Sequence, residues 1–189
     1  MLLTGYAQGI FPMAHAEHNW EVYWYAPDPR TILPLDTFHV SKSLARTVRK
    51  GIYEIRYDTA FREVMLACAE PRGDGQGTWI SDELIDGYLE LHEMGFAHSV
   101  EAWLDGELVG GLYGIALRGM FAGESMFHRA TDASKVCLVH LVEHLKAKGF
   151  VLHDCQFMTP HLSKFGAQEI TRYEYEERLR DALLVDAHF

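Results

Sequence analysis

Shortages of cysteine, of positive charge and of long apolar runs each exclude a class of protein. The chain has 3 cysteines, Cys68, Cys137 and Cys155, and this odd number without CxxC spacing argues against a disulfide-built secreted domain. No apolar run is long enough to span a bilayer, and the first residues lack the basic region of a signal peptide. We therefore expect a reduced, cytoplasmic protein without a membrane partner.

Positive charge is scarce along the chain but concentrated in one place. The 17 Lys and Arg residues against 27 Asp and Glu give a formal net charge of −10, which disfavours nucleic acid as a partner. The exception is a set of residues spaced i, i+4, i+7 and i+8 on one face of a predicted helix: Lys42, Arg46, Arg49 and Lys50. Arg72 is a candidate neighbour. This face is either a solvated helix surface or a contact for a phosphate backbone.

The spacing of apolar residues predicts one medium-sized domain. With 189 residues, 48% of them hydrophobic, the chain can bury a substantial core. Helical spacing predicts helices over residues 41–50, 61–68, 81–95 and 131–148, a short one ending at Gly166, and a last one from about Tyr173. Strands are predicted over residues 53–57, 99–104, 108–117, 120–125 and 150–157, with Asp105-Gly106 as a hairpin turn. This order favours an α+β or mixed α/β fold, with flanking helices on a central, mostly antiparallel sheet.

The N-terminal region differs from the rest in composition. Residues 1–27 are rich in glycine, aromatic residues and histidine, which predicts irregular structure with one short helix. Pro27-Asp28-Pro29-Arg30 predicts a rigid turn. We therefore expect a small N-terminal domain over residues 1–27 and a main domain over 28–189. Residues 71–77 predict a glycine-rich loop. Asp58 or Thr59 is expected to cap the predicted helix over residues 61–68.

Three polar residues are candidates for chemistry. Asp154 and Gln156 lie two apart on a predicted strand, so their side chains point the same way, and burying them requires polar partners. They either hold a polar ligand or cap loop backbone at the end of the strand. Glu124 in Gly123-Glu124-Ser125 is expected to be partly buried as well. Its partner is then Lys135, Arg129 or the cation of a ligand.

Two further patterns have competing interpretations. His140-Leu141-Val142-Glu143-His144 matches the HxxEH pattern of zinc proteases, but 11 histidines make a chance match easy and no third ligand follows at a persuasive spacing. We expect no metal. An apolar set is typical of either a plain core or a pocket for an apolar side chain: Trp79, Leu112, Phe121, Leu141 and Leu145.

Ordered motifs over nearly the whole chain add a family resemblance. They are Gly9-Ile10-Phe11-Pro12, Trp24-Tyr25-Ala26-Pro27-Asp28-Pro29-Arg30, Gly77-Thr78-Trp79-Ile80, His98-Ser99-Val100-Glu101, Leu108-Val109-Gly110-Gly111-Leu112-Tyr113-Gly114, Gly123-Glu124-Ser125-Met126-Phe127, Ala133-Ser134-Lys135 and Asp154-Cys155-Gln156. In these the chain resembles the leucyl/phenylalanyl-tRNA–protein transferases. The resemblance implies transfer of Leu or Phe from aminoacyl-tRNA to the N-terminal Arg or Lys of a protein, which marks that protein for degradation. It also implies an acetyltransferase-superfamily-like main domain behind a small N-terminal domain.

The resemblance also implies roles for single residues. Lys42, Arg46, Arg49 and Lys50 would contact the tRNA acceptor stem. Trp79, Leu112, Phe121, Leu141 and Leu145, with Gly123 and Met13, would form the pocket for the transferred side chain. Glu124, Asp154 and Gln156 would form the reaction centre.

Three departures from the family pattern bear on these roles. Few residues precede the Gly-Ile-Phe-Pro motif, so we expect a trimmed N-terminal domain. Met13 stands where the family has Trp, and Leu141 and Leu145 stand where it often has Phe. The pocket changes leave the choice among Leu, Phe and Met as the donor open.

The implied reaction needs neither metal nor cofactor, because an aminoacyl ester is already activated for attack by an amine. Orientation alone can lower the barrier by up to ~7–11 kcal/mol. We expect Asp154, or a water that it holds, to favour proton removal, and Gln156 to orient the amine or accept its proton through hydrogen bonds. Glu124, and Asp154 again, are expected to attract the acceptor's cationic side chain.

Three other functions compete with this one. An acetyl-CoA-dependent acetyltransferase would require a glycine-rich phosphate loop, and residues 128–134 contain no glycine. A zinc hydrolase on the HxxEH helix and a non-catalytic tRNA-binding module are the other two.

Overall fold

Helices and strands alternate along the chain. The computed structural model describes residues 1–71 and 78–189, so Arg72 and the predicted glycine-rich loop up to Gly77 lie outside the described residues. The helices are α1 (Leu2–Ala7), the 3-10 helix η1 (Ala16–His18), α2 (Lys42–Lys50), α3 (Phe61–Ala69), α4 (Asp82–Glu93), α5 (Ala133–Ala147), α6 (Pro160–Ser163) and α7 (Arg172–Ala182). The strands are β1 (Phe11–His15), β2 (Glu21–Tyr25), β3 (Arg30–Ile32), β4 (Glu54–Tyr57), β5 (Ala97–Leu104), β6 (Glu107–Leu117), β7 (Met120–His128), β8 (Leu152–Gln156) and β9 (Gln168–Ile170).

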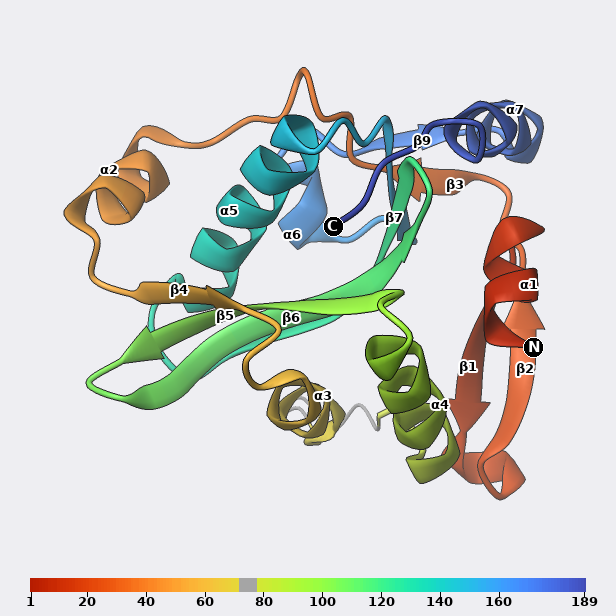
Figure 1. Cartoon of the computed structure of the whole chain (residues 1–189), viewed down its shortest axis with the longest axis horizontal. Coiled ribbons are helices and arrows are strands. Elements are labelled where there is room, and N and C mark those ends of the chain that lie inside the picture. The colour runs from red at the N-terminus through yellow and green to blue at the C-terminus, as the bar shows by residue number, and fades with distance from the viewer. Residues whose placement is uncertain (72–77) are drawn as a thin grey trace.

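A twisted sheet of seven strands organises the main part of the molecule (Figure 1). Its order is β4-β5-β6-β7-β8-β3-β9, and every neighbouring pair is antiparallel except β7 and β8. Parallel neighbours need a crossover connection, and α5 provides it between β7 and β8, so that both strands start from the same end of the sheet. The predicted mixed α/β fold with a mostly antiparallel central sheet is confirmed.

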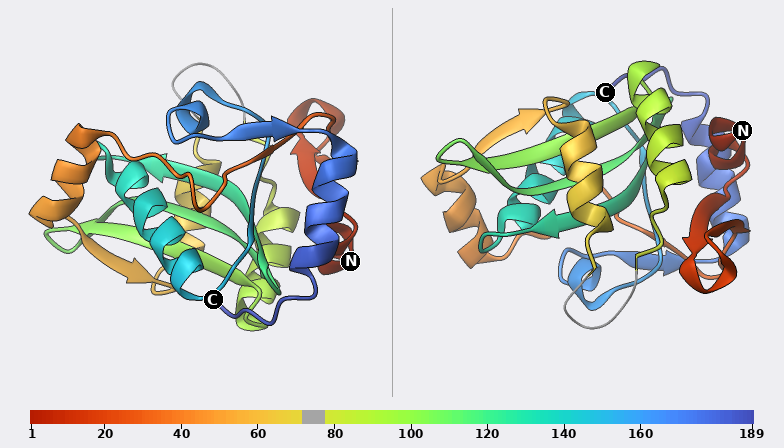
Figure 2. Two further views of the ribbon diagram at one scale, coloured as in Figure 1. Left: turned by 90° about the horizontal axis from the view of Figure 1, so that it is seen from above. Right: turned by 90° about the horizontal axis from the view of Figure 1, so that it is seen from below.

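Helices cover both faces of this sheet (Figure 2). Helix α5 packs on β5, β6 and β7 from one side, and α3 and α4 pack from the other. Gly110 permits the approach of α5, because a Cβ there would lie 2.5 Å from the Cβ of Ala133. Tyr6 and Phe11 of the N-terminal segment share the apolar core on the α3 and α4 side. None of the helices in the described part of the chain is both long enough and apolar enough to cross a membrane.

Local signals in the sequence located most elements. Ser41 and Ser81 lie at the predicted starts of two helices, and each accepts a hydrogen bond from a backbone N–H group in the first turn of α2 or α4. The turn between β5 and β6 has positive φ at Asp105 (52°) and Gly106 (84°), which suits a two-residue hairpin. Strands β3 and β9 were not predicted, because each is 3 residues long and has no room for a periodic pattern.

The prediction of irregular structure over residues 1–27 is wrong in part. Strands β1 and β2 form an antiparallel hairpin from Phe11 opposite Tyr25 to His15 opposite Glu21. Every residue of β2 is exposed or only partly buried. Because no side of β2 is buried, its sequence does not alternate between apolar and polar residues. That alternation is the signal by which a half-buried strand is recognised.

The predicted cap of α3 is also wrong. The helix has no side-chain cap at its own start, and Glu101 on β5 accepts hydrogen bonds from the backbone N–H groups of Thr59 and Ala60, both at 2.9 Å. Asp58 instead accepts from the N–H of Ser99 at 2.8 Å. A carboxylate far along the chain thus replaces the local cap.

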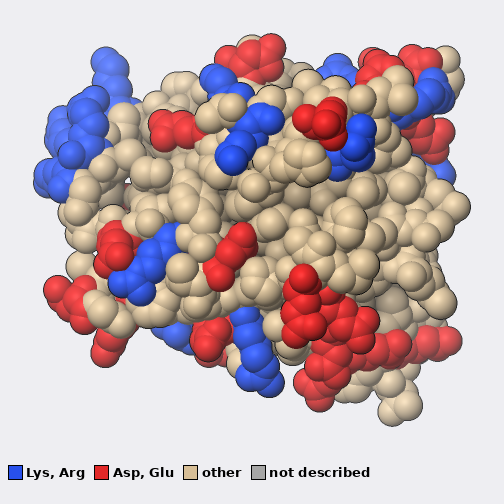
Figure 3. Space-filling view, viewed as in Figure 1, with Lys and Arg blue, Asp and Glu red and all other residues tan. Residues whose placement is uncertain are grey.

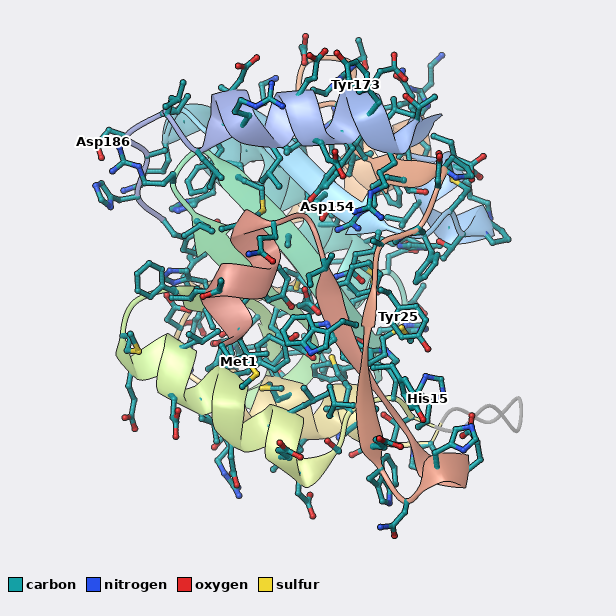
Figure 4. The ribbon with its side chains drawn as sticks, turned by 90° about the vertical axis from the view of Figure 1, so that its right-hand side faces the viewer. Met1, His15, Tyr25, Asp154, Tyr173 and Asp186 are labelled. Carbon is teal, nitrogen blue, oxygen red and sulfur yellow. The ribbon has the colours of Figure 1, made fainter. Side chains whose placement is uncertain are left out.

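A buried ion pair joins four segments of the chain. Arg30 on β3 and Asp154 on β8 are 1% and 0% exposed, and they form two hydrogen bonds, Nε to Oδ1 at 2.9 Å and NH2 to Oδ2 at 2.6 Å. Arg30 also donates to the carbonyl of Gly9, at 3.1 Å, and the hydroxyl of Tyr175 on α7 donates to Asp154 at 2.8 Å. Figure 4 shows Asp154 beneath α7, on the side of the molecule that carries α1 and the β1–β2 hairpin.

Aromatic rings complete the surroundings of the guanidinium. Its central carbon lies 4.6 Å from the ring centre of Phe11 and 4.4 Å from that of Tyr175. Such a charge is satisfied by the carboxylate, the carbonyl and the ring faces together. The N-terminal segment is therefore bound to the sheet through a group that cannot lose its charge.

Replacing Asp154 by Asn should destabilise the fold by about 3–5 kcal/mol, because it leaves the Arg30 charge buried without a counter-ion. Urea unfolding would measure the change. The matched control is Asp186→Asn, which breaks the exposed pair with Arg118 (2.8 Å) and should cost less than about 1 kcal/mol. Equal losses in the two variants would contradict a structural role for the buried pair.

Candidate active site

A cavity of about 820 Å³ opens where β7 and β8 separate. The two strands pair only over three positions, the last of which joins Ala122 and Asp154. Beyond that point, Glu124 on β7 and Gln156 on β8 both line the cavity. The lining includes seven of the residues expected at the site: Met13, Trp79, Leu112, Gly123, Glu124, Leu141 and Gln156.

Three other expected site residues lie behind the cavity wall. Phe121 and Leu145 are both 0% exposed and belong to the core on the α5 side of the sheet. Asp154 is equally buried and is not among the lining residues. The structure therefore groups the expected residues in one region but divides them between the lining and the layer beneath it.

Glu124 lies at the centre of a hydrogen-bond network. Its Oε1 accepts from the hydroxyl of Tyr6 at 2.7 Å and from the side-chain amide of Gln156 at 2.9 Å, and its Oε2 accepts from the hydroxyl of Tyr88 at 3.1 Å. The two tyrosine hydroxyls lie 2.5 Å apart. These donors come from α1, α4 and β8, so the carboxylate is held from three sides.

The expected protein cations for Glu124 are absent from this network. Lys135 pairs with Asp132 at 2.6 Å, and Arg129 pairs with Glu70 at 2.6 Å. Both predicted ion pairs are therefore wrong, because each cation pairs with a different carboxylate. Among the described residues, Glu124 forms no ion pair, and its partners are neutral donors.

This environment makes Glu124 an unusual carboxylate. Loss of hydration raises its pKa from near 4.5 to about 7, although the hydrogen bonds from Tyr6 and Tyr88 oppose the shift, and the nearby Asp154 charge adds to it. At neutral pH the group is therefore close to its point of ionisation. A carboxylate facing a cavity without a cation can bind a cationic group of a ligand.

Gln156 faces the cavity with a free acceptor. Its backbone has φ of 65°, so the regular alternation of the strand ends before it. The backbone N–H donates to Asp154 at 2.9 Å, while the side-chain amide donates to Glu124. Its side-chain carbonyl accepts no hydrogen bond within the described residues and can accept one from a ligand. Asp154 thus acts on the site by holding Gln156.

Away from Glu124 and Gln156 the cavity has both apolar and polar lining residues, and one of the polar ones was missed by sequence reasoning. Leu112, Leu138 and Leu141 form part of its wall. His153 also lines it, is 3% exposed, and has an Nδ1 without a hydrogen-bond partner. Burial lowers the pKa of His153 to about 4, so the imidazole is neutral at physiological pH.

Sequence reasoning also missed Arg30, Tyr6 and Tyr88. Their partners are 124, 118 and 36 residues away along the chain, and nothing local in the sequence marks them as polar contacts. For Arg30 a weak signal existed, since an arginine next to a short apolar stretch requires a partner if that stretch is a buried strand.

Helix α2 presents the predicted basic face to solvent. Its four basic residues, Lys42, Arg46, Arg49 and Lys50, are all exposed, and no ion pair holds them within the described ranges 1–71 and 78–189. Leu44 on the opposite side is 4% exposed and belongs to the core against α5. Figure 3 shows Lys and Arg side chains gathered over α2 at the left of the molecule.

The HxxEH motif lies on α5 and has no metal-binding geometry. The ring of His144 packs against Tyr57 and Phe189, with ring centres 5.0 and 4.5 Å away. In the part of the chain that the structure describes, no group of three or more His, Cys, Asp or Glu side chains could hold a metal ion.

Distant similarities to solved structures extend over much of the fold. "The structure of L-PGS from Bacillus licheniformis" is similar with a TM-score of 0.49 and 12% identity, over 90% of this chain and 63% of that one. An acetyl transferase from Salmonella typhimurium that modifies the N-terminal serine of L7/L12 is similar with a TM-score of 0.39 and 14% identity, over 71% of this chain and 81% of that one. Likenesses this distant carry no inference about function.

Sequence comparisons are much closer. The family model "Leucyl/phenylalanyl-tRNA protein transferase" matches residues 32–180, and the model of that family's N-terminal domain matches residues 1–28. The leucyl/phenylalanyl-tRNA–protein transferase of Herpetosiphon aurantiacus is 60% identical over 100% of this chain and 96% of its own length. Those of Paramagnetospirillum magneticum and Phenylobacterium zucineum are 56% and 55% identical, over 90% and 85% of their own lengths. The chain therefore belongs to the leucyl/phenylalanyl-tRNA–protein transferase family, and it is an aminoacyltransferase that uses aminoacyl-tRNA to modify a protein.

Proposed function

We propose that this enzyme transfers Leu, Phe or Met from aminoacyl-tRNA to the N-terminal Arg or Lys of a cytoplasmic protein, which marks that protein for degradation. One observation carries the choice of substrates: a single cavity combines an apolar wall with a carboxylate that has no cation of its own. The apolar wall suits the donor side chain. The carboxylate, Glu124, suits the cationic acceptor.

The donor would enter from the side of α2. The exposed basic face of this helix binds the phosphates of the acceptor stem, a contact that positions tRNA without reading its bases. The aminoacyl group then occupies the cavity beside Leu112 and Leu141, with Trp79 and Met13 near its entrance. Phe121 and Leu145 support this wall from beneath. Because one methylene changes binding by only ~1–3 kcal/mol, such a pocket accepts several apolar side chains.

The chemistry follows from the positions of Gln156 and Glu124. The acceptor's α-amine attacks the ester carbonyl, a C–N bond forms, the C–O bond to the ribose breaks, and the leaving ribose oxygen takes a proton from the amine. The free carbonyl of Gln156 accepts a hydrogen bond from the attacking amine and orients it. Ionised Glu124 binds the cationic side chain of the acceptor.

Asp154 takes a different role from the basic one expected. Its two oxygens already accept four hydrogen bonds, two from Arg30, one from Tyr175 and one from the backbone of Gln156. It does not line the cavity. We therefore assign Asp154 as a positioning residue that fixes the backbone of Gln156. We retain the division into a small N-terminal domain, residues 1–27, and a catalytic domain, 28–189, as part of the same proposal.

A transfer assay tests the proposed substrates. Leu-, Phe- and Met-tRNA should each give product with peptides that begin with Arg or Lys, and peptides that begin with Ala should give at least tenfold less, because Ala offers Glu124 no cation. Mass spectrometry of the peptides would identify the added residue. Equal transfer to Ala-initiated peptides would contradict acceptor recognition by Glu124.

The pH dependence of kcat/KM tests the role of Glu124. Below pH about 7 the carboxyl is protonated and neutral, so kcat/KM for an Arg-initiated peptide should rise as Glu124 ionises through that pH. In Glu124→Gln this rise should disappear, while the rise from deprotonation of the peptide amine remains. Glu83→Gln, exposed on α4, removes the same charge and should keep the wild-type profile. A wild-type profile in Glu124→Gln would reject the assignment.

Unfolding measures the same titration without substrate. The folded chain holds the Glu124 proton more tightly than the unfolded chain, so this group's contribution to the free energy of unfolding falls as pH rises from about 4.5 to about 7. Glu124→Gln should abolish this fall, and Glu83→Gln should not.

The basic face of α2 is tested by salt dependence. Reversing charge in Arg46→Glu/Arg49→Glu should weaken tRNA binding and reduce the slope of log K against log salt by about 2, one for each lost phosphate contact. Lys146→Glu/Lys148→Glu, exposed at the far end of α5, changes the net charge equally and serves as the control. If both pairs shift the slope alike, net charge rather than the α2 face governs binding.

A further inference from the structure

A second hollow connects the basic helix to the active-site cavity. It has a volume of about 220 Å³ and lies between the start of α2, at Ser41 and Ser43, and the start of α5. Asp132, Lys135 and His161 line both this hollow and the large cavity. The two spaces therefore lie side by side, and we call the smaller one the connecting groove (Ser41, Ser43, Asp132, Lys135, His161 and Lys164).

Basic groups gather along the connecting groove. Lys164 is exposed and forms no ion pair with any described residue, whereas Lys135 is paired with Asp132 at 2.6 Å. The charges of Lys135 and Asp132 offset each other, so the groove keeps the positive charge of Lys164. Burial, with the charges of Lys135, Lys164 and His128, lowers the pKa of His161, which shows how closely these groups crowd together.

His161 adds an unused polar atom to the same place. Its Nε2 is buried and has no hydrogen-bond partner in the described residues. A ligand atom in the groove would supply the hydrogen bond that this buried nitrogen lacks. The groove thus offers one free ammonium group and one unsatisfied imidazole nitrogen at the boundary with the cavity.

We propose that the connecting groove binds the phosphodiester backbone of the single-stranded 3′ end of tRNA, with Lys164 and His161 as its phosphate ligands. This inference rests on the proposed function, because the ligand is part of the same aminoacyl-tRNA. It accounts for the path of the donor: the stem lies on the α2 face, the unpaired end passes through the groove, and the aminoacyl group reaches the cavity. Phosphate contact there is independent of sequence, as on α2.

The test compares two donors that differ in phosphate. Phe-tRNA has the phosphodiester chain, and phenylalanyl-adenosine has the same ester with no phosphate. In Lys164→Gln, KM for Phe-tRNA should rise about 3- to 10-fold and the salt slope of tRNA binding should fall by about 1. KM for phenylalanyl-adenosine and both kcat values should stay unchanged. Lys164→Arg should retain wild-type values, because it keeps the charge.

Lys148→Gln is the matched control, since it removes one exposed charge at the other end of α5. The proposal is overturned if Lys164→Gln behaves like Lys148→Gln with Phe-tRNA, or if it raises KM equally for both donors. Wild-type transfer from Phe-tRNA tests the proposed function separately in the same assay. If no transfer occurs with either donor, the salt slope for uncharged tRNA still decides whether Lys164 contacts phosphate.

Discussion

The buried pair of Arg30 and Asp154 is the constraint on which the rest of the structure depends. A charge with almost no solvent exposure must be matched in place, and here two hydrogen bonds from the guanidinium meet both oxygens of the carboxylate. The same guanidinium reaches Gly9, and the carboxylate reaches Tyr175 and Gln156. The N-terminal segment, the sheet and the last helix are thus fixed relative to the residue that faces the substrate.

Two carboxylates near the cavity show how environment separates roles. Asp154 accepts four hydrogen bonds, two of them from the cation Arg30, and it serves the architecture. Glu124 has only neutral donors, and loss of hydration brings its pKa to about 7. Identical chemical groups therefore differ in what they offer to a ligand, because one already has a counter-ion and the other does not. The positive charge of the proposed acceptor would complement the second.

The enzyme is acidic, yet it acts on a polyanion. Charges separated by more than about 8–10 Å in physiological salt are largely screened, so the net charge of −10 matters less than the local groups on α2 and in the connecting groove. Many acidic residues lie elsewhere on the surface, including the region of α4 (Figure 3). A small basic surface can thus be enough to attract a polyanion if it lies beside the site of the reaction.

The sequence by itself determined the elements whose signals are local. The caps at Ser41 and Ser81, the Asp105-Gly106 turn and the basic face of α2 each depend on residues within a few positions of one another. It also determined the family, through motifs spread along the chain, and it selected Glu124 and Gln156, which both line the cavity.

Only the tertiary structure decided which polar groups meet. Nothing in the sequence around Asp154 predicts its contact with Arg30, and nothing around Glu124 predicts its contacts with Tyr6 or Tyr88. Those contacts form only when separate helices and strands pack together. The tertiary structure likewise moved Asp154, Phe121 and Leu145 behind the cavity wall. The physical reason is that periodicity and capping are properties of neighbouring residues, whereas burial, hydration and pairing of charge are properties of the assembled fold.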